Sequence, residues 1–288
     1  NPSTGRETTM PHLIEKASVQ RRIVIVGAGP GGLEAARVSA ERGHDVILFE
    51  AQNQPGGQLR LIARTQRRSE MIGIADWRIA ELERLGVDLR CNVFAGTEDI
   101  LTEHPDIVVI ATGGVPEPDI CTGGAMATSS WDILSADVPP GSEVLLFDDH
   151  GHEQGMQVAE FLVKAGATLE VVTPERMFGV DVSGMNHAPY ARALATHEAK
   201  ITVNSLLQSI EKKGNRLLVT LGSEYSDQTS SRQVDQVVVE CATRPLDELY
   251  FQLKPLSRNL GAVAHRDLIE GHPQSIATNP ESQFTLFR

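Results

Sequence analysis

A glycine-rich turn is the part of this sequence best suited to binding chemistry. It reads Gly27-Ala28-Gly29-Pro30-Gly31-Gly32 and follows the β-branched run Ile23–Val26. In a G-x-G-x-x-G turn between a strand and a helix, the first glycine permits the tight turn and the second lets the backbone approach a pyrophosphate. The third lets helix and strand pack closely, and the helix N-terminus supplies oriented N–H groups. The turn therefore predicts the pyrophosphate site of a dinucleotide.

An acidic residue at the end of the next apolar run completes this pattern. Glu50 stands 18 positions beyond Gly32, after a run that begins at Asp45. Its carboxylate would accept hydrogen bonds from ribose hydroxyls, and its charge would repel a 2′-phosphate. The alternative is a glycine turn that serves only packing, and the motif alone does not separate FAD from NAD.

Two later segments bear on whether the nucleotide is FAD or NAD. The loop Pro55-Gly56-Gly57-Gln58-Leu59 has two flexible residues and an amide where a loop can return to a pyrophosphate, although an ordinary glycine turn would look the same. A buried strand, Ile107–Ala111, is followed by Thr112-Gly113. Together with Glu50, these segments resemble the FAD half of flavoproteins that carry two dinucleotide folds.

More narrowly, the chain resembles the C-terminal part of the iron–sulfur flavoproteins related to trimethylamine dehydrogenase and bacterial 2,4-dienoyl-CoA reductase. The resemblance implies a preceding FMN barrel, a 4Fe-4S cluster and then tandem dinucleotide folds. The opening residues, Asn1–Glu7, resemble the segment just after the last cluster cysteine. With the apolar run Phe284–Arg288 stopping abruptly at the other end, we expect the chain to be a fragment.

The resemblance also implies site residues. It assigns the glycines of the turn, with Pro30 and Gly31 among them, to the pyrophosphate, Glu50 to the ribose and Gln58 to a loop contact. Arg68 stands where the family has a basic residue near the cofactor, and Ala95 where a backbone group touches adenine. An exposed turn arginine and a small packing residue are the alternatives. The expected cofactor-binding set is Gly27, Gly29, Pro30, Gly31, Gly32, Glu50, Gln58, Arg68, Ala95, Thr112 and Gly113.

The occupant of the site is expected to be FAD or ADP, because some relatives hold ADP there. The family's closing Gly-Asp, which contacts the flavin side of the cofactor, is absent from this chain. We therefore expect the adenine half of the site to be more complete than the flavin half.

A second strand–turn–helix unit lacks the glycines of a dinucleotide site. Matching Gly155 to the third glycine puts His150 and His152 at the first two positions, beside the carboxylates of Asp148 and Asp149. Two imidazoles would fill the space that a pyrophosphate needs, so we expect NAD(P) binding to be lost. An H-x-H pair is a weak metal signal, and no metal site is expected.

The degenerate second turn is most similar to the branch that demethylates N-methyl amines, of the dimethylglycine and N-methylproline type. The residues Asp247, Glu248 and Tyr250 look like the start of a surface helix rather than catalytic acids. No catalytic residue is expected in this chain. The resemblance implies as partners the FMN barrel of the same polypeptide, an electron-transfer flavoprotein and a second copy of the chain. The alternatives are an NADPH-dependent reductase of the dienoyl-CoA type and a non-catalytic scaffold.

Composition limits the function classes. The 288 residues carry a net charge of −12, which would repel a nucleic-acid backbone. No apolar run approaches the ~20 residues that cross a bilayer. The three cysteines are isolated, without a C-x-x-C pair, and fit a reducing cytoplasm.

The order of the expected strands and helices, which must position these residues, predicts an α/β protein. It has tandem Rossmann-like, glutathione-reductase-like three-layer folds with parallel central sheets. Residues 1–20 form an arm, 21–135 the FAD/ADP-binding domain, and 136–274 an inserted second domain. The last strand of the first domain resumes near 275–288. In the second domain, residues 201–210, 217–221 and 234–239 are expected as antiparallel strands, separated by the polar stretch 222–232.

Overall fold

The computed structural model describes residue 5, residues 13–241, 243–270 and 281–288, and the single residues 272, 274, 276 and 279. Most of the expected arm and of residues 275–280 lies outside this set. The chain divides into two compact units. Unit 1 comprises Asn1–Arg60, Glu70–Gly113 and Pro245–Arg288, and unit 2 comprises Leu61–Ser69 and Gly114–Arg244.

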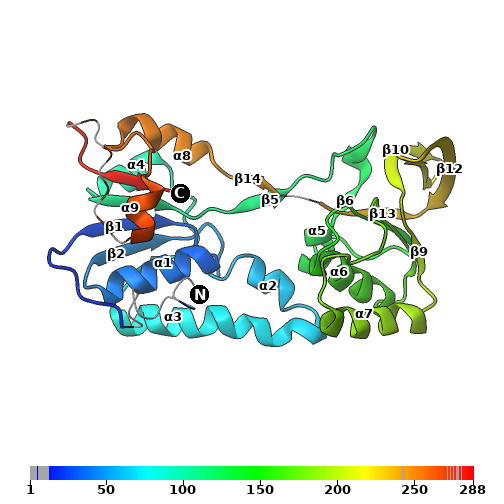
Figure 1. The fold of residues 1–288 in the computed structure, drawn as a ribbon, viewed down its shortest axis with the longest axis horizontal. Helices are drawn as coiled ribbons and strands as arrows, with labels where there is room; N and C mark the ends of the chain where they lie inside the picture. Colours follow the sequence, from blue (N-terminus) through cyan, green and yellow to red (C-terminus); the bar gives the residue numbers. More distant parts are fainter. Residues whose placement is uncertain are drawn as a thin grey trace. The chain divides into compact units, whose positions relative to one another are not determined.

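Unit 1 is built on a five-stranded parallel sheet in the order β15-β4-β1-β2-β3. Its strands are β1 (Arg22–Val26), β2 (Asp45–Phe49), β3 (Asp88–Arg90), β4 (Ile107–Ile110) and β15 (Thr285–Phe287). The inner strands β1, β2 and β4 are nearly continuous apolar runs because helices cover both faces of the sheet. Figure 1 shows α1 (Pro30–Glu41) and α3 (Gly73–Leu85) on one face, and α4 (Thr97–Thr102) and α8 (Glu248–Leu253) on the other.

Unit 2 has a second five-stranded parallel sheet, in the order β6-β13-β7-β8-β9. These strands are β6 (Thr128–Ser129), β7 (Glu143–Asp148), β8 (Thr168–Val172), β9 (Lys200–Thr202) and β13 (Gln236–Glu240). A separate antiparallel sheet contains β10 (Leu206–Lys213), β11 (Arg216–Ser223) and β12 (Ser226–Val234). Strand β7 alternates between two cores: Val144 and Leu146 pack with the helices, and Leu145 and Phe147 with the antiparallel sheet.

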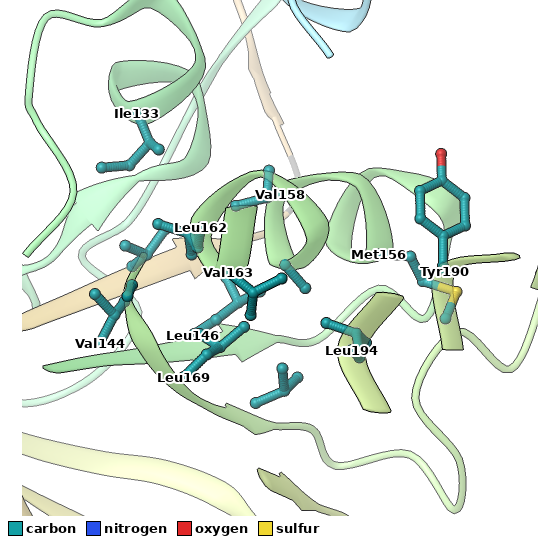
Figure 2. Packing of buried hydrophobic residues seen from close by; sticks show 14 of the residues in the cluster. Ile133, Val144, Leu146, Met156, Val158, Leu162, Val163, Leu169, Tyr190 and Leu194 are labelled. Carbon is teal, nitrogen blue, oxygen red and sulfur yellow. The ribbon is translucent and has the colours of Figure 1, made fainter. Parts of the chain in front are cut away.

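The helical side of unit 2 carries α5 (Ser130–Ser135), α6 (Glu153–Lys164) and α7 (Gly184–Thr196). Figure 2 shows Val163 of α6 close to Leu146 and Leu169 of the sheet, and Leu162, in the same cluster, is fully buried. The remaining short elements are α2 (Gln58–Ile62), β5 (Gly114–Pro116), β14 (Thr243–Pro245), α9 (His265–Glu270) and three 3-10 turns, Gln66–Ile72, Gly124–Met126 and Lys254–Leu256. Strands β5 and β14 pair with each other.

The expected α/β class and both parallel sheets are confirmed, but the domain boundaries at 135 and 274 are not where the chain divides. Residues 114–135 belong to unit 2, because β6 pairs with β13 and Ile133 joins the α6 core. The stretch that begins at Pro245 belongs to unit 1, because Leu253 of α8 is buried in the core of that sheet.

Two strand predictions were also wrong. Residues 234–239 were expected to be antiparallel, yet β13 lies between β6 and β7 in the second sheet and is parallel to both. The polar stretch 222–232 was expected to separate strands, and most of it is strand β12. Its side chains are exposed almost throughout, so no apolar alternation marks it, and hydrogen bonding to β11 holds it in place.

Candidate dinucleotide site

The glycine turn of unit 1 has the backbone geometry that a dinucleotide site needs. Gly27 has φ +100°, its N–H donates to the carbonyl of Phe49 at 2.8 Å, and a Cβ there would overlap the carbonyl of Ala111. A Cβ on Gly32 would overlap the carbonyl of Gly27. These two glycines are therefore required by close packing between the strand and α1.

The glycines at the mouth of the turn are different. Gly29 is the N-cap of α1, and a Cβ on Gly29 or Gly31 would meet no atom within 4 Å. Protein packing therefore does not explain why these positions lack side chains. Open space beside the first N–H groups of a helix is where an anion is stabilised. Pro30 is the first residue of that helix, where its missing N–H costs no hydrogen bond.

The carboxylate of Glu50 is held against this turn. Its Oε2 accepts the N–H of Ala28 at 2.7 Å and its Oε1 accepts the N–H of Gln52 at 2.8 Å, with the residue 8% exposed. The backbone is fixed as well, because the N–H of Glu50 donates to Arg90 and its carbonyl accepts from Val93. A carboxylate has about four lone-pair sites, so both oxygens can still accept hydroxyl groups. The contact with Ala28 was not foreseen from the sequence.

The loop after Glu50 returns to the glycine turn. The N–H of Gly56 donates to the carbonyl of Ala28 at 2.8 Å, and a Cβ on Gly57 would lie 3.1 Å from the Cα of Gly29. Both residues have positive φ, at +126° and +52°, which explains the glycine pair. Gln58 follows as the first residue of α2. The returning loop is confirmed as geometry, while the contact of Gln58 with a ligand stays a prediction.

Three more predicted site residues have structural surroundings. Thr112 donates through Oγ1 to the carbonyl of Leu246 at 2.6 Å, and Gly113, at φ +68°, accepts the N–H of Leu246 at 3.0 Å. Ala95 is 6% exposed, just before the N-cap of α4. These contacts explain the small or polar residue types without a ligand, so their cofactor role remains a prediction.

Arg68 is placed differently from the rest of the predicted set. It belongs to the segment 61–69 of unit 2, and its guanidinium forms an ion pair with Glu153 in the first turn of α6. Its neighbour Arg67 pairs with Glu160 at 2.6 Å, and Gln157 donates to the carbonyl of Ile62 at 2.6 Å. The structure thus gives Arg68 a partner within unit 2, a pairing that sequence spacing does not reveal.

The corresponding turn of unit 2 repeats the architecture with different chemistry. His152 is the N-cap of α6, and Gly155 occupies the third helical position, as Gly32 does in α1. A Cβ on Gly155 would lie 2.6 Å from the Cγ of Asp148, a fully buried carboxyl that accepts the N–H of His150 at 3.3 Å. Burial raises the pKa of Asp148 to about 7. An internal carboxyl group therefore takes one of the turn's N–H donors, and the imidazoles are partly exposed.

One further residue singled out from the sequence has a structural role. Asp247 is the N-cap of α8, which confirms the expected helix start at this point.

Within the described ranges, no three His, Cys, Asp or Glu side chains are grouped so that they could hold a metal ion. No helix in the part of the chain that the structure describes has the length and apolar character needed to cross a bilayer.

Known proteins match both the turn and the whole chain. Residues 25–75 match the family model described as an NAD(P)-binding Rossmann-like domain. Over its whole length the chain is 51% identical to a "Probable N-methylproline demethylase" of Rhizobium meliloti, covering 43% of it. It is 42% identical to the N,N-dimethylglycine/sarcosine dehydrogenase of Chromohalobacter salexigens, covering 44%. The chain thus spans about two fifths of the length of these curated relatives.

A solved structure supports the same relationship. A 2-naphthoyl-CoA reductase in complex with 2-naphthoyl-CoA is 29% identical, with a TM-score of 0.78 over 86% of this chain and 37% of that one. Three observations point to the same group of proteins: the glycine turn, the tandem parallel sheets and the similarity along the whole chain. Along its whole length the chain is therefore similar to one part of a group of oxidoreductases that includes these demethylases and dehydrogenases.

Proposed function

We propose that the glycine turn of unit 1 binds the adenine half of FAD, or ADP, within an oxidoreductase that oxidatively demethylates a small N-methylated amine. The observation that carries the proposal is the open space at Gly29 and Gly31 beside the held carboxylate of Glu50. When bound, FAD would supply a two-electron carrier. The turn would hold its pyrophosphate and Glu50 its ribose.

The whole enzyme would extend beyond this chain. The relatives are more than twice as long as the matched region, which leaves room for an FMN barrel that would oxidise the substrate and for a 4Fe-4S cluster. In this proposal, unit 1 packs against the FMN barrel and stabilises it. A cytoplasmic location, a homo-oligomeric state and an electron-transfer flavoprotein as acceptor belong to the same proposal.

The second candidate is a reductase that takes hydride from NADPH. Asp148 weighs against it, because its buried carboxyl lies against Gly155, where a dinucleotide fold requires close packing, and occupies a backbone donor of the turn. The ionised form of Asp148, whose pKa burial raises to about 7, would also repel a pyrophosphate. We therefore expect unit 2 not to bind NAD(P).

Anaerobic mixing of the full-length flavoenzyme with an N-methylated amine or with NADPH tests whether the protein is a demethylase or an NADPH-dependent reductase. Dimethylglycine or N-methylproline should bleach the flavin absorbance rapidly, and NADPH should not. Rapid bleaching by NADPH, with none by the amines, would reject the demethylase proposal and support the reductase.

A further inference from the structure

Phe94 is a large apolar side chain that the core of unit 1 does not bury. It is 89% exposed, whereas Val93 before it packs against the core of the first sheet and Ala95 after it is 6% exposed. A single exposed apolar side chain is ordinary on a protein surface, so the exposure by itself assigns no role. The position of Phe94 in the fold is what distinguishes it.

The segment that leads to Phe94 is held beside Glu50. The N–H of Val93 donates to the carbonyl of Glu50, and the N–H of Asn92 donates to the carbonyl of Gln52, both at 2.9 Å. Asn92 has φ +58°, a conformation that asparagine tolerates better than most residues. The backbone next to Phe94 is therefore fixed before a ligand binds, and the ring stays on the side of the residue predicted to hold the ribose.

The strand order places this segment where the base of a bound nucleotide would lie. Strands β1, β2 and β3 are parallel neighbours, so their carboxyl ends follow one another along one edge of the sheet, about 4.8 Å apart. The glycine turn follows β1, Glu50 follows β2, and residues 91–95 follow β3. A nucleotide with its pyrophosphate on the turn and its ribose on Glu50 runs in this same direction, and its next group is the base.

We propose that Phe94 is a stacking platform for adenine, with its ring against one face of the base when unit 1 binds ADP or FAD. The inference rests on the proposed nucleotide site and adds to it a residue that recognises the base. Stacking uses the π face of the base and covers apolar surface on both partners, so the exposed ring of Phe94 becomes buried only when the nucleotide is bound.

Calorimetric titration of the 288-residue chain with ADP tests this role. Phe94→Ala should weaken ADP binding about tenfold or more, as the loss of one base–aromatic stack does. Phe94→Tyr keeps the ring and should bind ADP within about twofold of the parent chain. The control is Tyr225→Ala, which removes a 76% exposed aromatic ring from the turn between β11 and β12 of unit 2 and should leave ADP affinity unchanged.

A second measurement separates stacking from a structural role. In NMR spectra of the chain with labelled phenylalanine, the ring signals of Phe94 are assigned by their loss in Phe94→Tyr. They should shift upfield on addition of ADP, because a stacked adenine shields them, and should not shift with pyrophosphate. Thermal unfolding checks that the variants are folded, and if Phe94→Ala is not, the ring shift in the parent chain decides.

The outcomes separate this inference from the nucleotide site on which it rests. Equal ADP affinities in the parent chain and Phe94→Ala would overturn the role of Phe94 alone. Equal losses in Phe94→Ala and Phe94→Tyr, or unshifted ring signals at saturating ADP, would do the same. A parent chain that does not bind ADP would reject the nucleotide site and the role of Phe94 together.

Discussion

The Oε2 atom of Glu50 accepts the backbone N–H of Ala28 at 2.7 Å, which ties the end of β2 to the middle of the glycine turn. The residue predicted to bind ribose is therefore also a part of the turn predicted to bind pyrophosphate. The carbonyl of the same Ala28 accepts the N–H of Gly56, so three separate segments meet at one residue. The site is held in shape by backbone contacts before any ligand binds.

Removing the Glu50 carboxylate should therefore weaken adenine-nucleotide binding. We expect Glu50→Ala to cost about 1–3 kcal/mol of ADP binding free energy, because hydrogen bonds to a charged group are lost. Calorimetric titration measures it, with Glu83→Gln, an exposed acid on α3, as the control. An unchanged ADP affinity in Glu50→Ala would exclude the ribose role.

The buried carboxyls of unit 2 should make stability fall as pH rises. Burial raises the pKa values of both Asp148 and Glu240 to about 7, against about 4 in an unfolded chain. The folded state therefore holds protons that the unfolded state releases, so stability decreases from about pH 4 to about pH 7 and levels off above that.

Asp148→Asn should flatten this decrease, because the amide cannot ionise. The free energy of unfolding, measured by urea denaturation between pH 5 and pH 8, should fall less in the variant than in the parent chain. Asp227→Asn, on the exposed strand β12, serves as the control. If Asp148→Asn has the same pH slope as the parent, Asp148 is already ionised at pH 5.

The α6 core of unit 2 should be sensitive to truncation. Leu162 is 0% exposed in the cluster of Figure 2, so Leu162→Ala should destabilise the protein by about 2–5 kcal/mol through lost burial and a cavity. Leu268→Ala on α9, where the side chain is 57% exposed, should cost well under 1 kcal/mol. Equal shifts in the urea midpoint for the two variants would contradict this packing.

Local patterns predicted the glycine turn and most strands, because backbone requirements there are set by neighbours in sequence. Gly32 is an example, since a Cβ there would overlap the carbonyl of Gly27, five positions earlier, whereas a Cβ on Gly27 would overlap the carbonyl of the distant Ala111. Helix α7 was missed, because the sequence has a proline, Pro189, inside it and only Tyr190 and Leu194 are buried.

Contacts between distant segments were beyond the sequence. The partner of Arg68 is Glu153, 85 positions away, and the turn around Gly155 packs on a carboxyl group rather than a backbone carbonyl. The division of the chain also depends on tertiary pairing, such as that of β6 with β13. Such relationships follow from the assembled sheets, not from spacing along the chain.

The central claim, that the first glycine turn binds an adenine nucleotide, is tested most directly at Gly29. A Cβ there meets no protein atom within 4 Å and the residue has φ −70°, so Gly29→Ala should lower the free energy of unfolding by only about 1 kcal/mol, the cost of alanine at an N-cap. It should reduce ADP affinity about tenfold or more, because the methyl group enters the space reserved for the pyrophosphate. Gly73→Ala, at an equally open position in α3, should change neither property. Calorimetric titration of the three proteins with ADP decides: equal affinities in the parent chain and Gly29→Ala, or no ADP binding by the parent, would contradict the account.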